Sequence, residues 1–174
     1  MEDRPLSYKE KNQDFERLRQ EVEANPHPIG LLLDQIELPR NLGSLYRIAD
    51  AARLEKIYGY QMDNMEKGKK VKRVARNSNE FVPYQNIQNV EVIQQLKSNY
   101  TIYALEITQQ SIPYTELKPK FPCLLLVGNE KRGVSKELLN LADQSIHIPM
   151  HGINLSMNVA VATAIATYKL LEHI

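Results

Sequence analysis

"PCLLLVGNEKRGVSKELLNLADQSIHIPM", residues 122–150, is the stretch that decides the fold. Its apolar start, residues 122–127, predicts a strand that runs into the loop 128–133. Residues 135–142 predict a helix, and residues 145–150 predict a second strand. A strand, a loop, a helix and a further strand form the unit of a parallel sheet, so this loop is a candidate ligand cradle.

The rest of the chain continues the alternation of strands and helices. Such alternation predicts an α/β fold, in which a parallel sheet has helices on both faces. Asn41 is expected to be the N-cap of the helix that follows the first strand. One domain is expected over residues 29–174, preceded by a polar N-terminal extension, residues 1–28. Strands are expected at 29–36, 56–60 and 100–106, and helices at 8–24, 42–55, 77–84, 90–99 and 155–174.

Composition excludes several classes of protein. The chain has 174 residues, of which 43% are hydrophobic and 25% charged, and a net charge of +1. Its single cysteine, Cys123, excludes an internal disulfide and a cysteine-based metal cluster, and its apolar surroundings favour a buried side chain. The charged N-terminus is not a signal peptide, and no apolar run reaches the roughly 18 residues of a membrane span. We therefore expect a cytoplasmic protein.

The loop 128–133 matches neither of the common phosphate-binding motifs. A Rossmann fingerprint needs G-x-G-x-x-G after the first strand, and the chain has none. The spacing of Gly128 and Gly133 fits the start of a Walker loop, but Val134 and Ser135 follow where that motif requires lysine and a hydroxyl residue. No cluster of histidines and carboxylates has metal-ligand spacing, so we expect no metal site.

Basic residues concentrate between Lys56 and Arg76, where seven face two acidic residues. The sequence centred on "EKGKKVKRVAR" is either a solvated basic loop or a patch that contacts phosphates, and the sequence leaves both readings open. The candidate phosphate-contacting residues are the cations Lys69, Lys70, Lys72, Arg73 and Arg76.

Three polar clusters follow predicted strands and are expected to meet at one edge of the sheet. The first, N-x5-R, runs from Asn41 to Arg47; the second is "LLLVGNEKRGVSKELL" before "IPM"; the third is "SMNVA", residues 156–160. Together, in this order, they resemble the three motifs of the SpoU (TrmH-type) branch of the SPOUT RNA methyltransferases. The resemblance extends from Ile29 to the C-terminus. Ala160 stands where the family often has serine.

The resemblance implies a fold, an activity and partners. It implies a C-terminal trefoil knot, a homodimer packed through the knot region, and methyl transfer from S-adenosylmethionine to a ribose 2'-hydroxyl in tRNA or rRNA. The catalytic residues that it implies are Arg47, Asn41, Glu130, Ser156 and Asn158. The expected cofactor-binding residues are Leu105, Glu106, Leu126, Val127, Gly128, Asn129, Gly133, Ile148, Met150, Ser156 and Met157.

Each implied role has a structural alternative. Gly128 and Gly133 also suit ordinary turns, Asn158 also suits a helix N-cap, and Glu106 also suits a simple loop. Glu130 is either a surface charge or an anchor for its loop and for the arginine that faces it. Arg47 is a poor base at neutral pH, so we expect it to orient the hydroxyl and stabilise developing negative charge rather than abstract the proton.

Two other functions remain open from the sequence. One is an inactive RNA-binding or assembly protein on the same fold, and the other is a nucleotide-binding enzyme on an ordinary doubly wound sheet. In the last predicted helix, residues Leu155, Val159, Ala162, Ala166 and Leu170 share helical spacing, and small residues lie between them. We expect this helix to form the dimer interface, with Ala160, Thr163, Ala164 and Thr167 allowing close approach.

Overall fold

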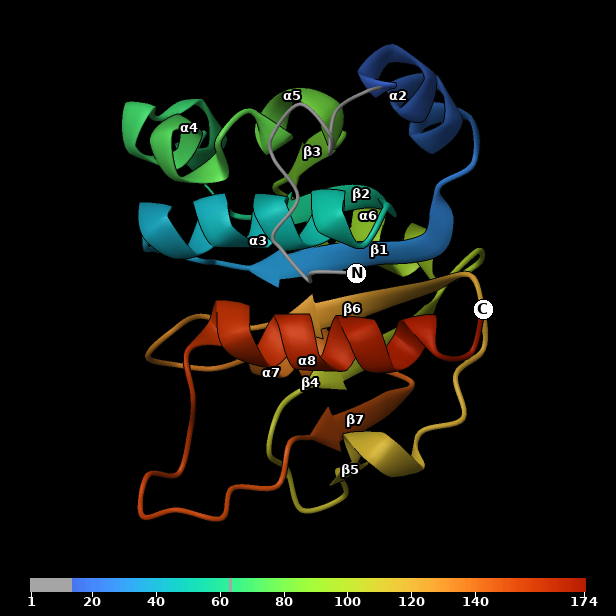
Figure 1. Cartoon of the computed structure of the whole chain (residues 1–174). Coiled ribbons are helices and arrows are strands. Elements are labelled where there is room, and N and C mark those ends of the chain that lie inside the picture. Colours follow the sequence, from blue (N-terminus) through green and yellow to red (C-terminus); the bar gives the residue numbers. More distant parts are fainter. Residues whose placement is uncertain (1–13, 63) are drawn as a thin grey trace, which may run out of the picture.

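Seven parallel strands form one sheet in the computed structural model, which describes residues 14–62 and 64–174 (Figure 1). The spatial order is β3-β2-β1-β6-β4-β7-β5, and every ladder is parallel. The strands are β1 (His27–Asp34), β2 (Leu54–Tyr60), β3 (Tyr84–Ile87), β4 (Thr101–Leu105), β5 (Ile112–Pro113), β6 (Cys123–Val127) and β7 (Gln144–His147).

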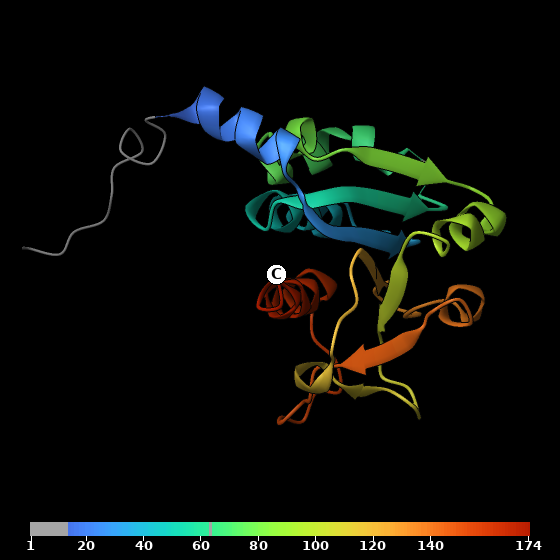
Figure 2. The same ribbon diagram turned by 90° about the vertical axis from the view of Figure 1, so that its right-hand side faces the viewer.

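Helices cover both faces of the sheet, as the edge-on view in Figure 2 shows. Helices α3 (Pro39–Ala51) and α8 (Val159–Leu171) lie side by side on one face, and α6 (Val90–Leu96) and α7 (Lys136–Leu139) lie on the other. The remaining helices are α2 (Phe15–Ala24), α4 (Lys69–Ala75), α5 (Ser78–Phe81) and the short turns η1 (Met65–Lys67) and η2 (Tyr114–Glu116). This arrangement confirms the predicted fold class. The trefoil knot stays a prediction.

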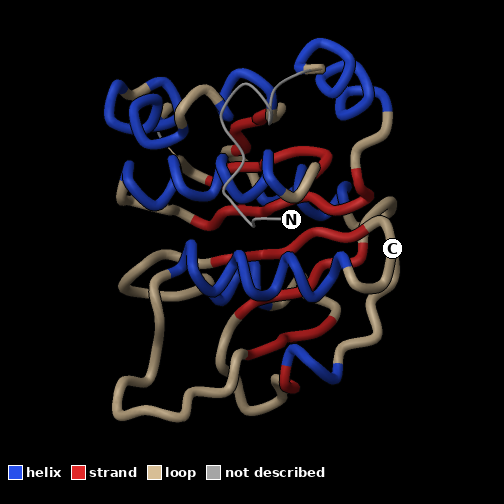
Figure 3. The backbone as a smooth tube through the Cα atoms, in the orientation of Figure 1, coloured by secondary structure: helices blue, strands red, loops and turns tan. Residues whose placement is uncertain are grey.

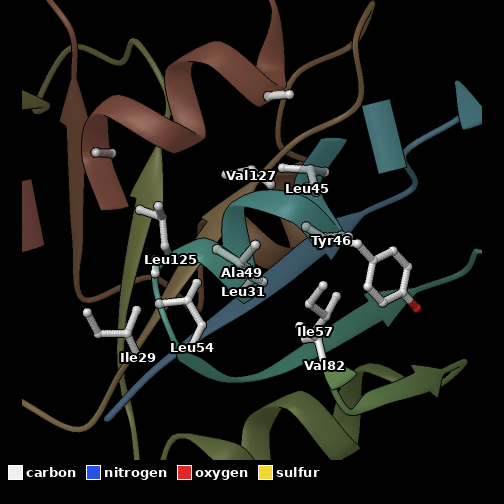
Figure 4. Packing of buried hydrophobic residues seen from close by; sticks show 14 of the residues in the cluster. Ile29, Leu31, Leu45, Tyr46, Ala49, Leu54, Ile57, Val82, Leu125 and Val127 are labelled. Carbon is white, nitrogen blue, oxygen red and sulfur yellow. The ribbon is translucent and has the colours of Figure 1, made fainter. Parts of the chain in front are cut away.

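The central strands are apolar on both faces because each face has its own core. Successive side chains of a strand point to opposite sides. In β1, Leu31 and Leu33 pack towards α3 and α8, whereas Leu32 packs towards α6 and α7. Figure 4 shows the first core, in which Leu45 and Ala49 of α3 meet the side chains of β1 and β6. Within the described residues, no helix is long and apolar enough to cross a membrane.

Helix α4 packs closely on α3 because Gly43 has no side chain. A Cβ atom built at Gly43 would lie 2.6 Å from Val74 Cβ and 3.0 Å from the backbone oxygen of Val71. Val71 and Ala75 of α4 are buried against the domain, and the basic side chains between them face solvent. The glycine of the first motif therefore sets the distance between α3 and α4.

We expect Gly43→Ala to lower the free energy of unfolding by about 1–3 kcal/mol, the usual cost of an overpacked contact. The new methyl group must push α4 away from α3. Urea unfolding followed by circular dichroism measures the change. Gly152→Ala is the matched control, because a Cβ there meets nothing within 4 Å. Equal stabilities of the two variants would contradict this account of Gly43.

Several predicted boundaries are wrong, and local packing explains why. The first strand begins at His27, inside the stretch assigned to the N-terminal extension. Helix α2 begins at Phe15, and residues 8–13 of the predicted helix lie outside the described residues. The basic segment is a helix rather than a loop, because Val71 and Ala75 recur four residues apart and bury one side. The short strands β3 and β5 were not predicted.

The start of two helices also differs from the prediction. Helix α3 begins at Pro39, whose fixed φ suits the first helical position, so Asn41 lies inside the first turn and is not the N-cap. The last helix begins at Val159 instead of Leu155. Its N-cap is Asn158, whose Oδ1 accepts hydrogen bonds from the backbone N–H groups of Ala160 and Val161 at 3.0 and 3.3 Å. Figure 3 shows the irregular segment that precedes α8.

Candidate cofactor and active site

A pocket of about 690 Å³ lies where β4, β6 and β7 end. Leu105, Val127 and His147, the last residues of these strands, line it. The three sequence motifs, which are far apart in the chain, meet around this cavity. The expected site residues that line it are Asn41, Leu105, Glu106, Val127, Gly128, Asn129, Glu130, Gly133, Ile148, Met150, Ser156, Met157 and Asn158.

Two expected site residues lie elsewhere. Leu126 is fully buried in the core beneath α6 and α7, because the alternation along β6 turns it away from the pocket wall that Val127 lines. Arg47 is exposed on α3 and does not line the pocket. Ser156 does line the pocket, but it lies in the exposed segment before α8 and not in the helix.

The loop 128–133 closes on itself through backbone hydrogen bonds. Asn129 and Gly133 form a two-way bridge, with N–H donors 3.0 and 2.9 Å from the opposite carbonyl oxygens. The Asn129 side chain accepts from the N–H groups of Lys131 and Arg132 and donates to the Gln35 carbonyl oxygen at 2.7 Å. Gly133 has a φ of +68°, a conformation that favours glycine. The loop is thus a rigid, polar rim of the pocket.

Glu106 braces this loop from the neighbouring strand. Its Oε2 accepts from the Val134 N–H at 2.9 Å, and a side chain at Gly133 would collide with the same oxygen. Oε1 accepts from the Ile107 N–H at 2.9 Å. The carboxylate therefore has a structural role at the pocket wall, whether or not it also contacts a ligand.

Glu130 joins the second motif to the first. Its Oε2 accepts from the Glu37 N–H at 3.0 Å, and its Oε1 accepts from the Leu38 N–H at 3.0 Å and from the Asn41 side-chain amide at 2.8 Å. The first N–H groups of a helix have no partners within the helix, so a carboxylate near them is favourable. Glu130 thus anchors the start of α3, and the expectation that it faces Arg47 is wrong.

Asn41 continues the chain of hydrogen bonds to the third motif. Its Oδ1 accepts from the Asn158 side-chain amide at 3.0 Å. Asn41 is buried, and Asn158 uses its own Oδ1 to cap α8. The Glu130–Asn41–Asn158 relay therefore connects the three motifs around the pocket. Hydrogen bonds hold each of the three side chains in place, and the role that the structure shows for them is to position the pocket walls.

The pKa of the Glu130 carboxyl lies below its ordinary value. Burial raises this pKa, but the hydrogen bonds from the Glu37 N–H, the Asn41 side chain and the Leu38 N–H together outweigh burial. A carboxyl with a depressed pKa in the folded state stabilises the fold above its unfolded pKa, about 4.3, and that stabilisation is lost as the pH falls through the folded pKa.

We expect acid to weaken the fold partly through Glu130. As the pH is lowered from 7 towards 3, the urea midpoint of the wild type should fall more steeply than that of Glu130→Gln, which carries no ionisable group at this position. At pH 7 the Glu130→Gln variant should be the less stable of the two, because it loses hydrogen bonds to a charged acceptor. Parallel pH profiles for the two proteins would rule out this role.

The sequence missed several residues that shape the site. His147 lines the pocket, and its Nδ1 lies 3.0 Å from the Ser111 hydroxyl. Ser111 directly precedes β5, the strand next to β7. Asp34 is buried at the end of β1 and accepts from the Ser135 N–H at 2.6 Å. Only the position of Asp34 at the end of an apolar run could have indicated it from the sequence.

The predicted RNA-binding residues share an exposed surface. Lys69, Lys70, Lys72 and Arg73 are exposed on α4, and Arg76 is exposed at its C-cap. In Figure 1 this helix lies beside α3, away from the strands β4 and β7 that bear the pocket.

Comparisons with known proteins support the motif assignment. The SpoU rRNA Methylase family matches residues 28–168. A tRNA (guanosine(18)-2'-O)-methyltransferase of Aquifex aeolicus is 30% identical over 89% of this chain and 74% of its own length. The 23S rRNA (guanosine(2553)-2'-O)-methyltransferase RlmP of Bacillus subtilis is 34% identical over 80% of this chain, which spans 56% of that relative.

Solved structures show the same fold. The A. aeolicus TrmH/SpoU tRNA modifying enzyme superposes with a TM-score of 0.81 at 29% identity and covers 93% of this chain and 83% of its own. The AdoMet-bound rRNA methyltransferase of Sinorhizobium meliloti superposes with a TM-score of 0.78 at 26% identity, covering 90% of this chain and 60% of its own. With a family match over most of its length, the chain belongs to the SpoU rRNA methylase family.

Proposed function

We propose that this protein is an S-adenosylmethionine-dependent RNA methyltransferase that modifies a ribose 2'-hydroxyl in tRNA or rRNA. The observation that carries the proposal is the Glu130–Asn41–Asn158 relay, which gathers three motifs of the SpoU family around one pocket. The relatives named for guanosine 2'-O-methylation act on both tRNA and rRNA, so their names support both substrate classes. We also place the protein in the cytoplasm, where these RNAs are modified.

The pocket fits S-adenosylmethionine in size and in chemistry. Its volume of about 690 Å³ falls within the range of about 300–1,000 Å³ that is usual for small-molecule sites. Leu105, Val127 and Ile148 offer an apolar surface for an adenine ring, and the loop 128–133 offers backbone groups. Met150, Ser156 and Met157 would hold the cofactor from the opposite wall. A related rRNA methyltransferase was solved with AdoMet bound.

The residues of the chain would bind and orient the reactants. The bound cofactor supplies a methyl group that is already activated as an electrophile. What remains is to hold the 2'-hydroxyl in line and to stabilise its oxygen as the proton leaves. Arg47 is the proposed source of positive charge for that oxygen. Glu130, Asn41 and Asn158 position the pocket walls, while Ser156 lies free in the pocket wall to contact a reactant.

Calorimetry tests the cofactor, and RNA mapping tests the reaction. The protein should bind S-adenosylmethionine and S-adenosylhomocysteine but not ATP. Mass-spectrometric mapping of 2'-O-methyl groups in total RNA should reveal a site that is lost when the gene is deleted. Tight ATP binding would favour a nucleotide enzyme instead. If the protein binds RNA but neither binds S-adenosylmethionine nor methylates any RNA, an inactive RNA-binding or assembly role is favoured.

A homodimer is part of the proposal, and the exposed apolar side chains near α8 support it. Val161 and Tyr168 on α8 are each 52% exposed, and Leu155 is 83% exposed. The small residues predicted to allow close approach of a second chain are instead mostly internal: Ala160, Thr163 and Thr167 are buried within this chain, where α8 packs on α3. The proposed interface is therefore the opposite side of the helix.

We expect sedimentation at micromolar concentration to give the mass of a dimer. Tyr168→Glu should shift it to a monomer, because a charge on a buried interface is costly. Leu18→Glu, which changes an equally exposed side chain on α2, should leave the dimer intact. A monomeric wild-type protein would refute the homodimer without touching the cofactor assignment.

A further inference from the structure

We infer that Arg40 binds the RNA phosphate beside the target ribose, as the pocket-side end of a phosphate-binding surface that crosses α3 and α4. We call this the α3–α4 basic surface and define it by its members Arg40, Lys69, Lys70, Lys72, Arg73 and Arg76. The inference rests on the proposed function and adds a substrate-binding residue that the three motifs do not contain.

Arg40 lies at the edge of the pocket. It is the second residue of α3, and its neighbours Leu38 and Asn41 both line the cavity. Glu130 and the backbone of residues 37 and 38 hold this turn of the chain in place. The Arg40 side chain is exposed, and within residues 14–62 and 64–174 it makes no hydrogen bond or ion pair. A fixed backbone therefore presents a free guanidinium beside the residues that line the pocket.

Arg47 lies on the same side of α3, two turns further along. Seven residues of helix correspond to nearly two full turns and about 10 Å of rise. Gly43 lies one turn after Arg40 and one turn before Arg47, and it contacts Val74 of α4. Helix α4 thus crosses α3 between the two arginines. Its exposed cations add further positive charge beside α3.

Among the described residues, no acidic side chain of this region forms an ion pair with these cations. Asp50 accepts a hydrogen bond from the Ser78 hydroxyl at 2.8 Å, and one carboxylate oxygen of Glu66 is buried. Three other arginines are paired: Arg19 with Glu23, Arg53 with Glu21 and Arg132 with Glu37. Like charges that gather on one surface without acidic partners indicate an anionic partner, and a polyphosphate backbone supplies evenly repeated charges.

The chemistry of the two reactants favours arginine at the pocket edge. A ribose 2'-hydroxyl lies next to the phosphate on the 3'-oxygen of the same ribose, so holding that phosphate fixes the direction of the hydroxyl. The planar guanidinium can bind a phosphate through two parallel hydrogen bonds, which fixes orientation as well as position. The lysines of α4 act as point charges and contribute affinity without orientation.

Three variants separate these roles. Arg40→Gln removes the pocket-edge cation, Lys72→Gln removes one cation from α4, and Lys118→Gln removes an exposed cation outside the surface as the matched control. Binding is measured by fluorescence anisotropy with an unmodified tRNA transcript at several salt concentrations. Arg40→Gln and Lys72→Gln should each weaken binding several-fold and lower the slope of log affinity against log salt by about one, whereas Lys118→Gln should match the wild type.

Methyl transfer then distinguishes orientation from affinity. The substrate is total RNA from cells that lack the gene, at saturating concentration, with labelled S-adenosylmethionine in single turnover. Arg40→Gln should lower the rate about tenfold, whereas Lys118→Gln, outside the surface, should leave it unchanged. Arg40→Lys should restore the salt slope but not the rate, because it lacks the planar fork. The affinity for S-adenosylhomocysteine should be the same in all variants.

The outcomes separate this inference from the proposed function. If the wild type methylates that RNA and Arg40→Gln behaves like Lys118→Gln in affinity and rate, the inference is wrong and the proposed function stands. If Arg40→Gln changes only affinity, Arg40 belongs to the surface but does not orient the ribose, and the pocket-edge role is refuted. If the wild type neither binds S-adenosylhomocysteine nor methylates the RNA, the proposed function itself fails.

Discussion

Arg47→Ala is expected to lower the single-turnover rate of methyl transfer by two or more orders of magnitude while cofactor affinity stays the same. That is the usual cost of removing a donor that stabilises charge developing in a transition state. The 2'-hydroxyl becomes negative as its proton leaves, and a guanidinium beside it favours that charge. Cofactor affinity should not change, because Arg47 does not line the pocket.

The exposure of Arg47 makes its role depend on bound RNA. Among the described residues Arg47 has no hydrogen bond or ion pair, so nothing in the free protein fixes its guanidinium. We expect Arg47→Lys to rescue the rate only in part, since a point charge lacks the planar fork. Arg17→Ala, which removes an exposed arginine from α2, is the matched control and should retain the full rate.

A particular result would remove Arg47 from the catalytic machinery. Should Arg47→Ala keep the single-turnover rate at saturating RNA and lose only RNA affinity, the residue is a phosphate anchor like the cations of α4. The rate must therefore be measured over a range of RNA concentrations and not at one subsaturating value.

Gly128→Ala is expected to weaken S-adenosylhomocysteine binding by a hundredfold or more, which corresponds to about 2.7 kcal/mol. A Cβ at Gly128 would overlap the backbone of Gly133 and Val134, which cannot move aside as a flexible side chain can. The loop would have to open, breaking the bridge between Asn129 and Gly133 and the hydrogen bond from Val134 to Glu106. The rim of the pocket would then be lost.

Calorimetry of folded protein measures this loss. Circular dichroism must first show that the variant retains its secondary structure. Gly152→Ala is the control within the same pocket region, because it lies in the segment before α8 and has open space around it. Unchanged binding by Gly128→Ala would show that the closed form of the loop is not required for the cofactor.

The sequence predicted the parts of this fold that depend on strong local patterns. Continuous apolar runs such as β1 and β6 require a sheet buried on both faces, and the three motifs mark the ends of strands that meet. Edge strands were missed because β3 has two adjacent polar residues among its four and β5 has only 2 residues. Such segments are stabilised by their neighbours rather than by their own composition.

The sequence predicted most residues of the candidate site, but it did not predict which of them contact one another. Gly128, Glu130 and Asn158 belong to motifs that the sequence displays. That Glu130 binds the start of α3 and not Arg47 depends on where two distant segments are placed in space. Leu126 and Val127 were both expected at the pocket, but side chains alternate along β6, so Val127 lines the pocket and Leu126 lies in the opposite core. Arg40 carries no motif, so only its position at the pocket edge indicates it.

The relay also fixes when the pocket can form during protein synthesis. Glu130 and Asn41 are 89 residues apart in sequence, and Asn158 and Asn41 are 117 apart. Contacts at such separation form late, because a long loop must first be closed. A nascent chain that has not yet reached Asn158 lacks the cap of α8 and one wall of the cavity. The cofactor therefore cannot guide early folding, and its binding reports that the last helix is in place.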